Sequence, residues 1–552
     1  MVVNKSLWLS IVVALGGVMS AHAQSFRVQC PLTTALHPGT TSDQGAIKCQ
    51  QISGGDGYST MADGHQIFMF SFGPLSGLND IANGLPGTQP APVFMTTFDP
   101  GALPGSAASN GAVGLSPDPD VADDPACGAT APSPKPSYCT TGLTGHVDPR
   151  QILDVGVMNG NIPAPLMAID EDDEFFLTLT NVGMVMRPDL FEQHTVHFHG
   201  YPNASSFYDG VPDASVAIDI GGSMTYYYLA PDAGTYFWHC HITPPEHLQM
   251  GMVGQIYVRP RQNRVSSGSG LWASLAGGSG LAGSNPTGQQ SDLRTKCGSD
   301  ILCSSPIPPS NSVTHAANKN GSPTLYAYND GDGSTAYDVE YPIQIHGFDP
   351  SFHFVGQTFN PEQFTDMKDK YFLLNGRSYP DTIRTTQYVD PGSGSGNSAF
   401  VGQPAISNAM YTQDSDAVAR PSQPLNTVVN IPAGGKALLR ISDLDVTEYQ
   451  TLASLGIPMH VIGLNARMLR DLAGNNMSYF SNSITLAGGE SIDVVLDASL
   501  NKPDGTAYTA GETYYLYTPN LDHLANDAEN FGGLMTEIHI CNSVDPSTKI
   551  CK

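Results

Sequence analysis

Short hydrophobic runs separated by turn-forming residues are the dominant pattern of residues 151–259. Residues 175–181 alternate between hydrophobic and polar side chains, the period of two that turns one face of a strand toward a core. Residues 67–72 and 152–157 are further predicted strands, and an Asn-Gly turn at residues 159–160 follows the second of them. Short strands with this spacing predict an all-β sandwich rather than a helical fold.

The second half of the chain, residues 324–542, repeats this pattern. Four of its segments resemble four segments of the first half in residue type and spacing. In pairs, they are Leu374–Pro380 with Met158–Pro163, Ile457–Gly463 with His194–Gly200, Thr513–Pro519 with Thr235–His241, and Gly533–Ile540 with Gly251–Val258. We therefore expect two β-sandwich domains, each with Greek-key topology.

Changes in composition along the chain suggest where these domains begin and end. The first domain is expected at residues 24–260, with a long loop insertion or surface arm at about 76–149 that is rich in Gly, Pro, Ala and Asp. Residues 261–323 are dense in Ser, Gly and Asn and are predicted to be an interdomain linker. The second domain is expected at residues 324–552.

Composition and charge agree with a loop-rich β protein. Only 14% of the 552 residues are charged, while 58 are Gly and 42 are Pro. The net charge of −27 argues against a nucleic-acid partner, because phosphates repel such a surface. It favours cationic partners, such as metal ions or a basic redox protein, only weakly, since most surface charge serves solubility. The acidic run 170–174 is predicted to be a solvated turn.

The first 23 residues have the organisation of a secretory signal. Lys5 supplies the positive charge, residues 7–19 are apolar, and Ala21-His22-Ala23 is a small-residue cleavage site. The apolar run is shorter than the ~20 residues that span a bilayer, and no later stretch is long and apolar enough. We expect a mature protein without a membrane span, in the periplasm or outside the cell.

The chain has nine cysteines, an odd number. Eight of them lie in four pairs of close neighbours, and local disulfides are plausible in an oxidising compartment, although sequence alone leaves the connectivity open. The four pairs are Cys30 with Cys49, Cys127 with Cys139, Cys297 with Cys303, and Cys541 with Cys551. Cys240 is left over.

The stretch from Gly234 to Met252 holds a concentrated set of metal ligands. It contains His239, Cys240, His241, His247 and Met252. A soft thiolate, imidazoles and a thioether form the donor set that suits copper. An electron-transfer copper site needs two histidines, a cysteine and a weak axial methionine, so one further histidine must come from elsewhere in the chain.

The upstream stretch His194–Gly200 supplies that histidine. Neighbouring side chains on a strand point to opposite faces, so Cys240 faces away from both His239 and His241. In the same way, His197 and His199 share one parity and His194 has the other. Pairing by parity joins His194 to Cys240, His247 and Met252. A lone histidine is ordinarily a core or surface residue, but six histidines and a cysteine in two short clusters predict two copper sites served by one strand.

These two stretches resemble the copper motifs of multicopper oxidases of the laccase type and, more distantly, of copper nitrite reductases. Both families are built from cupredoxin domains, and the resemblance is strongest from Asn159 to Val258. It implies a type 1 copper held by His194, Cys240, His247 and Met252. It also implies a type 2/type 3 copper site held by His197, His199, His239 and His241, with Asp209 as an acidic helper in oxygen reduction.

The activity that this resemblance implies is one-electron oxidation of a reductant at the type 1 copper. Electrons would pass through the His-Cys-His segment to the second copper site, with dioxygen as the expected acceptor. The reductant is not readable from the sequence and includes phenols, metal ions and redox proteins. Two-domain members of this family usually assemble as trimers.

The second half departs from the copper pattern. Tyr517-Thr518-Pro519 stands where the first half has His-Cys-His, and Leu534 stands where it has Met252. The second domain is therefore not expected to hold a type 1 copper. In the sequence alignment only His197 has a matching histidine, His460, which is a further candidate ligand. The remaining lone histidines, which are ordinarily core or surface residues, are His346, His353, His523 and His539.

The second half also lacks most of the histidines that, by this resemblance, a complete oxidase would contribute to the second copper site, and their absence from the sequence keeps two alternatives open. One is an electron-transfer or copper-binding protein whose second site is incomplete, although a pure electron carrier has no use for His239 and His241. The other is nitrite reduction at a single type 2 copper. His199 and His239 suit that site, whereas His197 and His241 do not.

Overall fold

The computed structural model of the chain describes residues 28, 30–38, 46–96, 98–99, 101–103, 105–112, 133, 160–201, 205–230, 232–277, 307–316, 324–357, 363–383, 411–413, 419–421, 427–545 and 547–552. The predicted signal sequence, the strand expected at 152–157 and four of the paired cysteines (Cys127, Cys139, Cys297 and Cys303) lie outside these residues. Within the described ranges, no helix has the length and apolar character needed to cross a bilayer.

The first half of the chain forms a β-sandwich. One sheet has the strand order β2 (Gln66–Pro74), β1 (Ile47–Thr60), β5 (Glu174–Gly183) and β7 (Ser223–Leu229), with β3 (Gln89–Pro90) paired to β1. The other has the order β4 (Met167–Asp170), β9 (Val253–Arg259), β8 (Gly234–His239) and β6 (His197–Phe198). Their facing side chains, among them Phe72, Leu177 and Trp238, form one buried apolar core.

The second half forms another sandwich. One sheet has the order β13 (Tyr371–Leu374), β12 (Val339–Phe348), β17 (Lys436–Asp443), β23 (Ser491–Asp497), β19 (Met459–Leu464) and β20 (Arg467–Met468), with β21 (Tyr479–Ser481) paired to β19. The other has the order β16 (Val429–Pro432), β25 (Met535–Cys541), β24 (Thr513–Tyr517), β18 (Gln450–Leu455) and β22 (Ser483–Leu486). Its core includes Ile343, Leu439 and Leu516. The predicted all-β sandwich architecture is confirmed.

The remaining elements are short. Two small sheets of two antiparallel strands are β10 (Leu325–Tyr326) with β11 (Ala336–Tyr337), and β14 (Tyr411–Gln413) with β15 (Ala419–Pro421). The α-helices are α2 (Leu78–Ala82), α3 (Ala91–Phe94), α7 (Pro244–Gln249), α8 (Leu271–Gly277) and α9 (Pro350–Gln357). The 3-10 turns are η2 (Ala107–Ser109), η3 (Ser206–Tyr208), η4 (Arg261–Arg264), η6 (Phe364–Asp366), η7 (Asp381–Ile383) and η9 (Leu521–His523).

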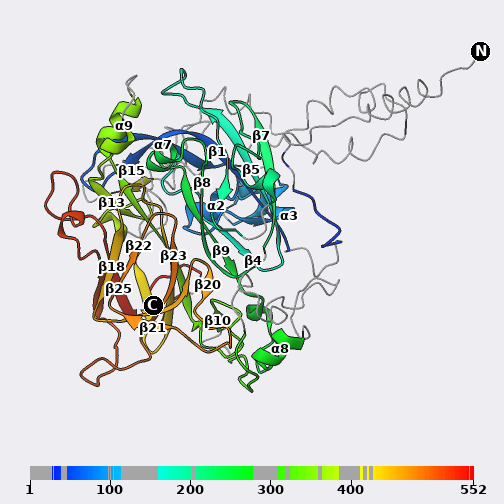
Figure 1. Ribbon diagram of the computed structural model, residues 1–552, viewed down its shortest axis with the longest axis vertical. Coiled ribbons are helices and arrows are strands. Elements are labelled where there is room, and N and C mark those ends of the chain that lie inside the picture. The colour runs from blue at the N-terminus through cyan, green and yellow to red at the C-terminus, as the bar shows by residue number, and fades with distance from the viewer. Residues whose placement is uncertain are drawn as a thin grey trace, which may run out of the picture.

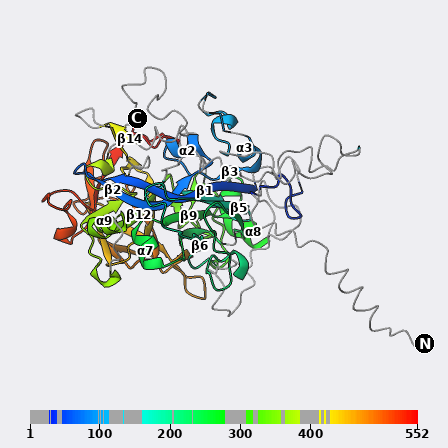
Figure 2. The same ribbon diagram turned by 90° about the horizontal axis from the view of Figure 1, so that it is seen from above.

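The two sandwiches pack against each other, as Figure 1 shows with the first above the second. Strand β8 contacts β17 and β23, so the sheet that carries the predicted copper strand is covered by the second sandwich. Thr235 donates to Asp493 across this boundary at 2.6 Å, and Phe237 packs on Leu444. The view from above in Figure 2 shows α7 and α9 at the same end of the molecule.

Strand register corrects one part of the predicted repeat. Tyr517 pairs with Met535 as His239 pairs with Val253, which agrees with the sequence alignment of these strands. The strand that pairs with β24 is β18, however, and it sets Ala453 opposite Tyr517 where β6 sets His197 opposite His239. The structural counterpart of His197 is therefore Ala453. The proposed match of Ile457–Gly463 with His194–Gly200 is wrong, because β19 belongs to the opposite sheet, beside β23.

Three other expectations about local structure differ from what is found. The described part of the predicted insertion is not a free surface arm, because Phe94 and Ala112 pack with Phe176 on the outer face of β5. The acidic run 170–174 is not a solvated turn, since Glu171 is fully buried. The start of the predicted linker pairs with that run, where Arg264 contacts Asp172 at 2.6 Å. The missed signal was charge complementarity between these two segments.

The cysteine predictions hold for the described residues. Disulfides join Cys30 to Cys49 and Cys541 to Cys551. Cys240 is free and buried.

Buried charges at the boundary between the sandwiches generate a stability prediction. Arg440 is fully buried and lies 3.0 Å from the Glu340 carboxylate, which also pairs with Arg259. We expect Arg440→Ala to lower the free energy of unfolding by about 3–5 kcal/mol, because it leaves a buried carboxylate less compensated. The measurement is the shift in the chemical denaturation midpoint. The control is Lys502→Ala, which removes the Lys502–Glu512 pair and is expected to move the midpoint little.

Candidate metal centre

Three buried side chains from separate elements converge in the core of the first sandwich. They are His194, in the segment before β6, Cys240, which follows β8, and His247 on α7. One ligand atom from each lies within 4.8 Å of those of the other two, and all three residues have no exposed surface. The Cys240 thiol sulfur is 3.3 Å from His247 Nδ1. We call these residues, with Met252, the Cys240 cluster.

Alternation along β8 directs Cys240 inward. Tyr236, Trp238 and Cys240 belong to the core of the first sandwich, while Phe237 belongs to the cluster shared with the second sandwich. His194 is fixed by two backbone hydrogen bonds with Ile218, at 3.1 and 3.0 Å. The Cys240 thiol therefore points into the core of the first sandwich, and the flanking histidines point to the opposite face of the sheet, as the alternation of side chains predicts.

Met252 is tied to the same cluster through the backbone. Its N–H donates to the His247 carbonyl at 2.8 Å, and its own carbonyl accepts from the Cys240 N–H at 3.1 Å. The side chain is fully buried in the core that holds Cys240. Met250, the other methionine of this loop, lies instead beside Gly356 of α9, where an added Cβ would come within 3.3 Å of its methyl carbon.

The pKa values of Cys240, His194 and His247 are shifted by burial and by the charges of their neighbours. Burial opposes ionisation of the Cys240 thiol, but the charge of His247, its hydrogen bond to the sulfur and the neighbouring His194 ring hold the pKa of Cys240 well below its usual value. Burial likewise opposes protonation of His247, yet the thiolate and Glu192 raise its pKa to about 9. Burial lowers the pKa of His194. These shifts favour a thiolate at Cys240 and a protonated ring at His247, with a neutral ring at His194.

The buried polar atoms of this cluster that have no hydrogen-bond partner could bind a soft metal ion. Neither ring nitrogen of His194 has a hydrogen-bond partner, although both are buried. Such groups cost free energy unless something binds them, and functional sites are where they persist. A thiolate, two imidazoles and a buried thioether form a copper donor set.

Two residues of this site were missed by sequence reasoning. Gly54 of β1 lies directly under the His194 ring, where an added Cβ would sit 2.5 Å from Cδ2. Glu192 reaches His247, with its carboxylate 3.3 Å from Nε2, and its side chain is 27% exposed. Glu192 is two residues from His194, a signal that was present in the sequence, whereas nothing in the sequence links Gly54 to this pocket.

The second cluster lies on the other face of β8 and β6. His197 pairs directly with His239 across the strands, and the ring nitrogens of His197, His199 and His239 lie within 4.8 Å of one another. His241 is adjacent, with its ring centroid 5.2 Å from that of His197, but it is outside this tightest group. We call these four residues the His239 cluster. His199 is exposed, so the cluster opens to solvent.

Hydrogen bonds orient the rings of the His239 cluster. His197 Nδ1 donates to the Asp209 carbonyl oxygen at 2.7 Å, and the Asp209 carboxylate is 3.5 Å away. His239 Nδ1 donates to the Cys240 carbonyl oxygen at 2.7 Å. Each hydrogen bond keeps the ring proton on Nδ1 and leaves the lone pair of Nε2 free to bind a metal. Contacts of this kind commonly fix the tautomer of a metal-binding histidine. Burial lowers the pKa of His239 to about 3, so it stays neutral and able to bind a metal.

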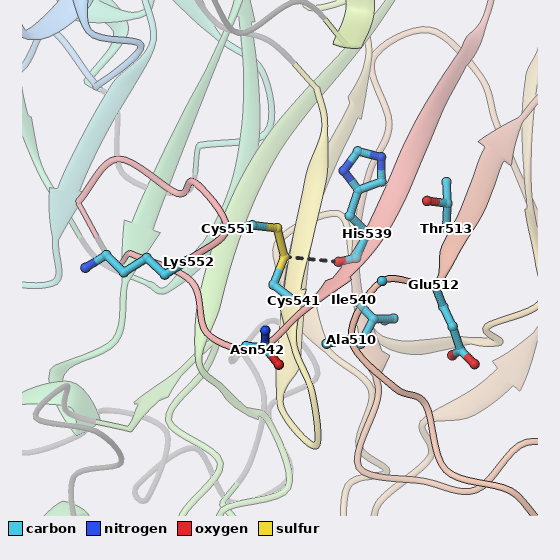
Figure 3. Close-up of a pocket in the computed structure, with 10 residues that line it drawn as sticks. Ala510, Glu512, Thr513, His539, Ile540, Cys541, Asn542, Cys551 and Lys552 are labelled. Atoms are coloured by element: carbon cyan, nitrogen blue, oxygen red, sulfur yellow. Dashed lines mark hydrogen bonds between the residues drawn. A yellow bond between two sulfur atoms is a disulfide. The ribbon is translucent and has the colours of Figure 1, made fainter.

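The structure does not bring His460 to either cluster. Its Nε2 hydrogen-bonds to the Ser478 hydroxyl at 2.7 Å, and its ring stacks on Phe480 in the opposite sheet of the second sandwich. His460 was selected from an alignment that the strand register corrects. His539 pairs with Glu537 and lines a hollow of about 330 Å³ beside the Cys541–Cys551 disulfide, shown in Figure 3, which contains none of the predicted copper ligands.

The second sandwich has a counterpart of the Cys240 cluster without its ligands. Thr518 N donates to Leu534 O, and Leu534 N donates to His523 O, at 2.9 and 3.0 Å, as Cys240, Met252 and His247 do in the first sandwich. With Ala453 matched to His197, Gln450 takes the place of His194. His523 contacts Gln450 Oε1 and the Glu448 carboxylate, both at 3.0 Å. In this pocket, hydrogen bonds to Gln450 and Glu448 hold the His523 ring where the first sandwich has metal ligands.

Protonation of His247 generates a testable pH dependence. His247 is protonated at neutral pH, since its pKa is about 9, and it must lose that proton before it can bind a metal. We expect about one proton to be released per copper bound at pH 7, and copper affinity to rise about tenfold per pH unit up to about pH 9. Calorimetry in buffers of different ionisation enthalpy measures the release. Two protons would show that Cys240 is protonated in the metal-free chain.

The packing of Gly54 generates a second prediction. Gly54→Ala is expected to push His194 aside and to weaken copper binding at the Cys240 cluster by about 10- to 100-fold, the usual effect of disturbing an outer contact. Titration against a competing chelator measures the change. The control is Gly270→Ala, where the nearest atom would be 3.5 Å away. Equal affinities of the two variants would contradict the role of Gly54.

Comparison with known proteins gives an independent result. Residues 144–263 match the family model described as multicopper oxidase. "Laccase abr2" of Aspergillus fumigatus is 34% identical over 111 residues, or 20% of this chain and 17% of the laccase. The copper-containing nitrite reductase of Rhizobium meliloti is 33% identical over 123 residues, or 21% of this chain and 29% of the reductase.

The alignments with these relatives cover only part of each protein. The aligned part spans less than a third of the length of either curated relative. Among solved structures, the multicopper oxidase mgLAC is 14% identical, with 91% of this chain and 93% of that chain covered at a TM-score of 0.44. Residues 144–263, which carry both clusters, are therefore the part of the chain that is similar to multicopper oxidases, and copper is the metal that this similarity implies.

Proposed function

We propose that this chain is an exported copper-dependent oxidoreductase of multicopper oxidase type. His194, Cys240, His247 and Met252 hold a type 1 copper, and the His239 cluster holds a second copper site. Bound copper supplies one-electron redox chemistry at both sites. Residues 24–260 and 324–552 are the two domains, and the reaction is assigned to the first.

The connection between the two clusters carries this proposal. Cys240 and His239 are consecutive residues, and the His239 ring also donates to the Cys240 carbonyl at 2.7 Å. This gives a through-bond route and a parallel hydrogen-bonded route between a soft thiolate site and an imidazole site. A protein that only stored or carried copper would not need two clusters joined in this way.

The two ends of that route suggest where reductant and acceptor bind. Glu192 is partly exposed and contacts Nε2 of His247, so it provides an acceptor for a phenolic hydroxyl or a carboxylate for a metal cation. At the other end, the His239 cluster opens beside Asp209, whose carboxylate is 34% exposed. We assign dioxygen as the acceptor there, with Asp209 as the group that holds a proton for it.

A second candidate, an electron carrier with an incomplete second site, has one supporting observation. Among the described residues, the histidines around the second site are His197, His199, His239 and His241, all from the first sandwich. The position opposite Tyr517 in the second sandwich is Ala453 rather than a histidine. This reading predicts a single blue copper per chain.

The test is copper content with optical and EPR spectra on the copper-loaded full chain. The proposal predicts a thiolate-to-copper band and more than one copper per chain, with oxygen consumption in the presence of a phenol or a reduced metal ion. Cys240→Ser should abolish the band while leaving copper at the His239 cluster. One copper with a blue band would establish the electron carrier, and nitrite consumption without oxygen consumption would establish a nitrite reductase. No blue band would refute the type 1 site.

A further inference from the structure

The short helix α7, which carries His247, has few contacts within itself that could hold its orientation. It spans the six residues Pro244–Gln249, too few for a helix to be stable in isolation. Its N-cap, Thr243, has a left-handed backbone (φ 36°) and makes no capping hydrogen bond through its side chain. The direction of the His247 ring therefore depends on what holds α7 from outside.

Two buried histidines of the second sandwich hold the C-terminal carbonyl groups of α7. His346 of β12 donates from Nε2 to the Leu248 carbonyl at 3.0 Å. His353 of α9 has Nε2 2.9 Å from the Gln249 carbonyl and Nδ1 2.7 Å from the Phe68 carbonyl of β2. The last carbonyls of a helix have few partners within it. The Leu248 carbonyl also accepts from the Gly251 N–H at 3.0 Å, so His346 adds a second contact to it from outside the helix. Burial lowers the pKa of His353 to about 3, so its neutral ring packs between the Gln249 and Phe68 carbonyls and donates to one of them.

The Gln249 side chain makes a second attachment to the same sandwich. Its Oε1 accepts from the Asp349 N–H at 3.1 Å, and its Nε2 donates to the Asp369 carboxyl at 2.9 Å. Gln249 has no exposed surface, and Asp369 is only 4% exposed. Both polar ends of this amide, two residues from His247, are therefore held by the second sandwich.

Asp369 is held in turn by a buried group of polar side chains. Thr447 donates to it, and a hydrogen bond joins it to the Asp445 carboxyl. Gly347 packs against the pair so closely that an added Cβ would overlap Asp369. Burial, together with the Asp445 charge, raises the pKa of Asp369 well above its usual value. Asp369, held by Thr447 and Asp445, is thus the hydrogen-bonded anchor for Gln249.

We infer that His346, His353 and Asp369 are positioning residues, through which the second sandwich sets the geometry of His247 and Met252 around the metal. The inference rests on the proposed type 1 site. It gives the second sandwich, which has lost its own ligands, a defined role at the copper site of the first. It also accounts for His346 and His353, which neither cluster uses.

The test compares His353→Leu with a matched control, His315→Leu. His315 is also buried between two carbonyl oxygens, those of Val265 (2.6 Å) and Thr324 (3.0 Å), but it contacts no residue of α7. Both variants should lose stability. Only His353→Leu should shift the thiolate-to-copper band, the copper hyperfine coupling and the reduction potential, and weaken copper binding by about 10- to 100-fold.

Two variants of Asp369 test its hydrogen bond with Gln249 directly. Asp369→Asn keeps a side-chain oxygen that accepts from Gln249 Nε2, so its spectrum and potential should match those of the wild type. Asp369→Ala should shift both. If His353→Leu does not fold, His346→Gln replaces it, with the same expected shift.

The outcomes separate this inference from the proposed function. Unchanged spectra in the His353 or His346 variant, with a blue wild type, would overturn it. Equal shifts in the His353 and His315 variants would also overturn it, because the effect would then be general loosening. A wild-type chain without a blue band would instead refute the type 1 site itself.

Discussion

The alternation of side chains along β8 is the constraint on which the rest of this structure depends. Tyr236, Trp238 and Cys240 enter the core of the first sandwich, while Phe237 and His239 face the second. A slip of one residue would exchange the two faces and destroy both clusters at once. The pairing of β8 with β9 on one side and β6 on the other fixes this register, and the buried Trp238 makes a slip costly.

The two sandwiches show one scaffold with and without a metal site. In the first, the His194 ring is buried with both nitrogens unpaired, a condition that costs about 1–3 kcal/mol for each unsatisfied group. In the second, Gln450 and Glu448 satisfy the ring of His523, so that pocket is stable without a metal. The second sandwich lacks the copper ligands of the first, and it contacts α7 of the first through His346, His353 and Asp369.

Buried carboxylates elsewhere in the molecule also have hydrogen-bond or ion-pair partners. Glu171, predicted to be solvated, accepts from the backbone of Arg261 and from the Asn329 amide. Glu340 lies between Arg259 and Arg440, and its pKa falls because those two charges outweigh the effect of burial. These groups join segments far apart in sequence, so a local pattern of charges could not reveal that they are buried.

The sequence by itself determined the all-β architecture, the free Cys240 among paired cysteines, and the division of the clustered histidines between two faces. These follow from local rules, since strand alternation and ligand chemistry act over a few residues. Only the tertiary structure decided that Ala453, rather than His460, is the counterpart of His197 in the second sandwich, because that depends on which strand of a repeat pairs with which. The same holds for Gly54 beneath His194, and for the attachment of α7 by His353 and Asp369. Such contacts join residues more than a hundred positions apart. The contact of Gly54 with His194 forms when the first sandwich folds, and the contacts of α7 form only when the two sandwiches pack together.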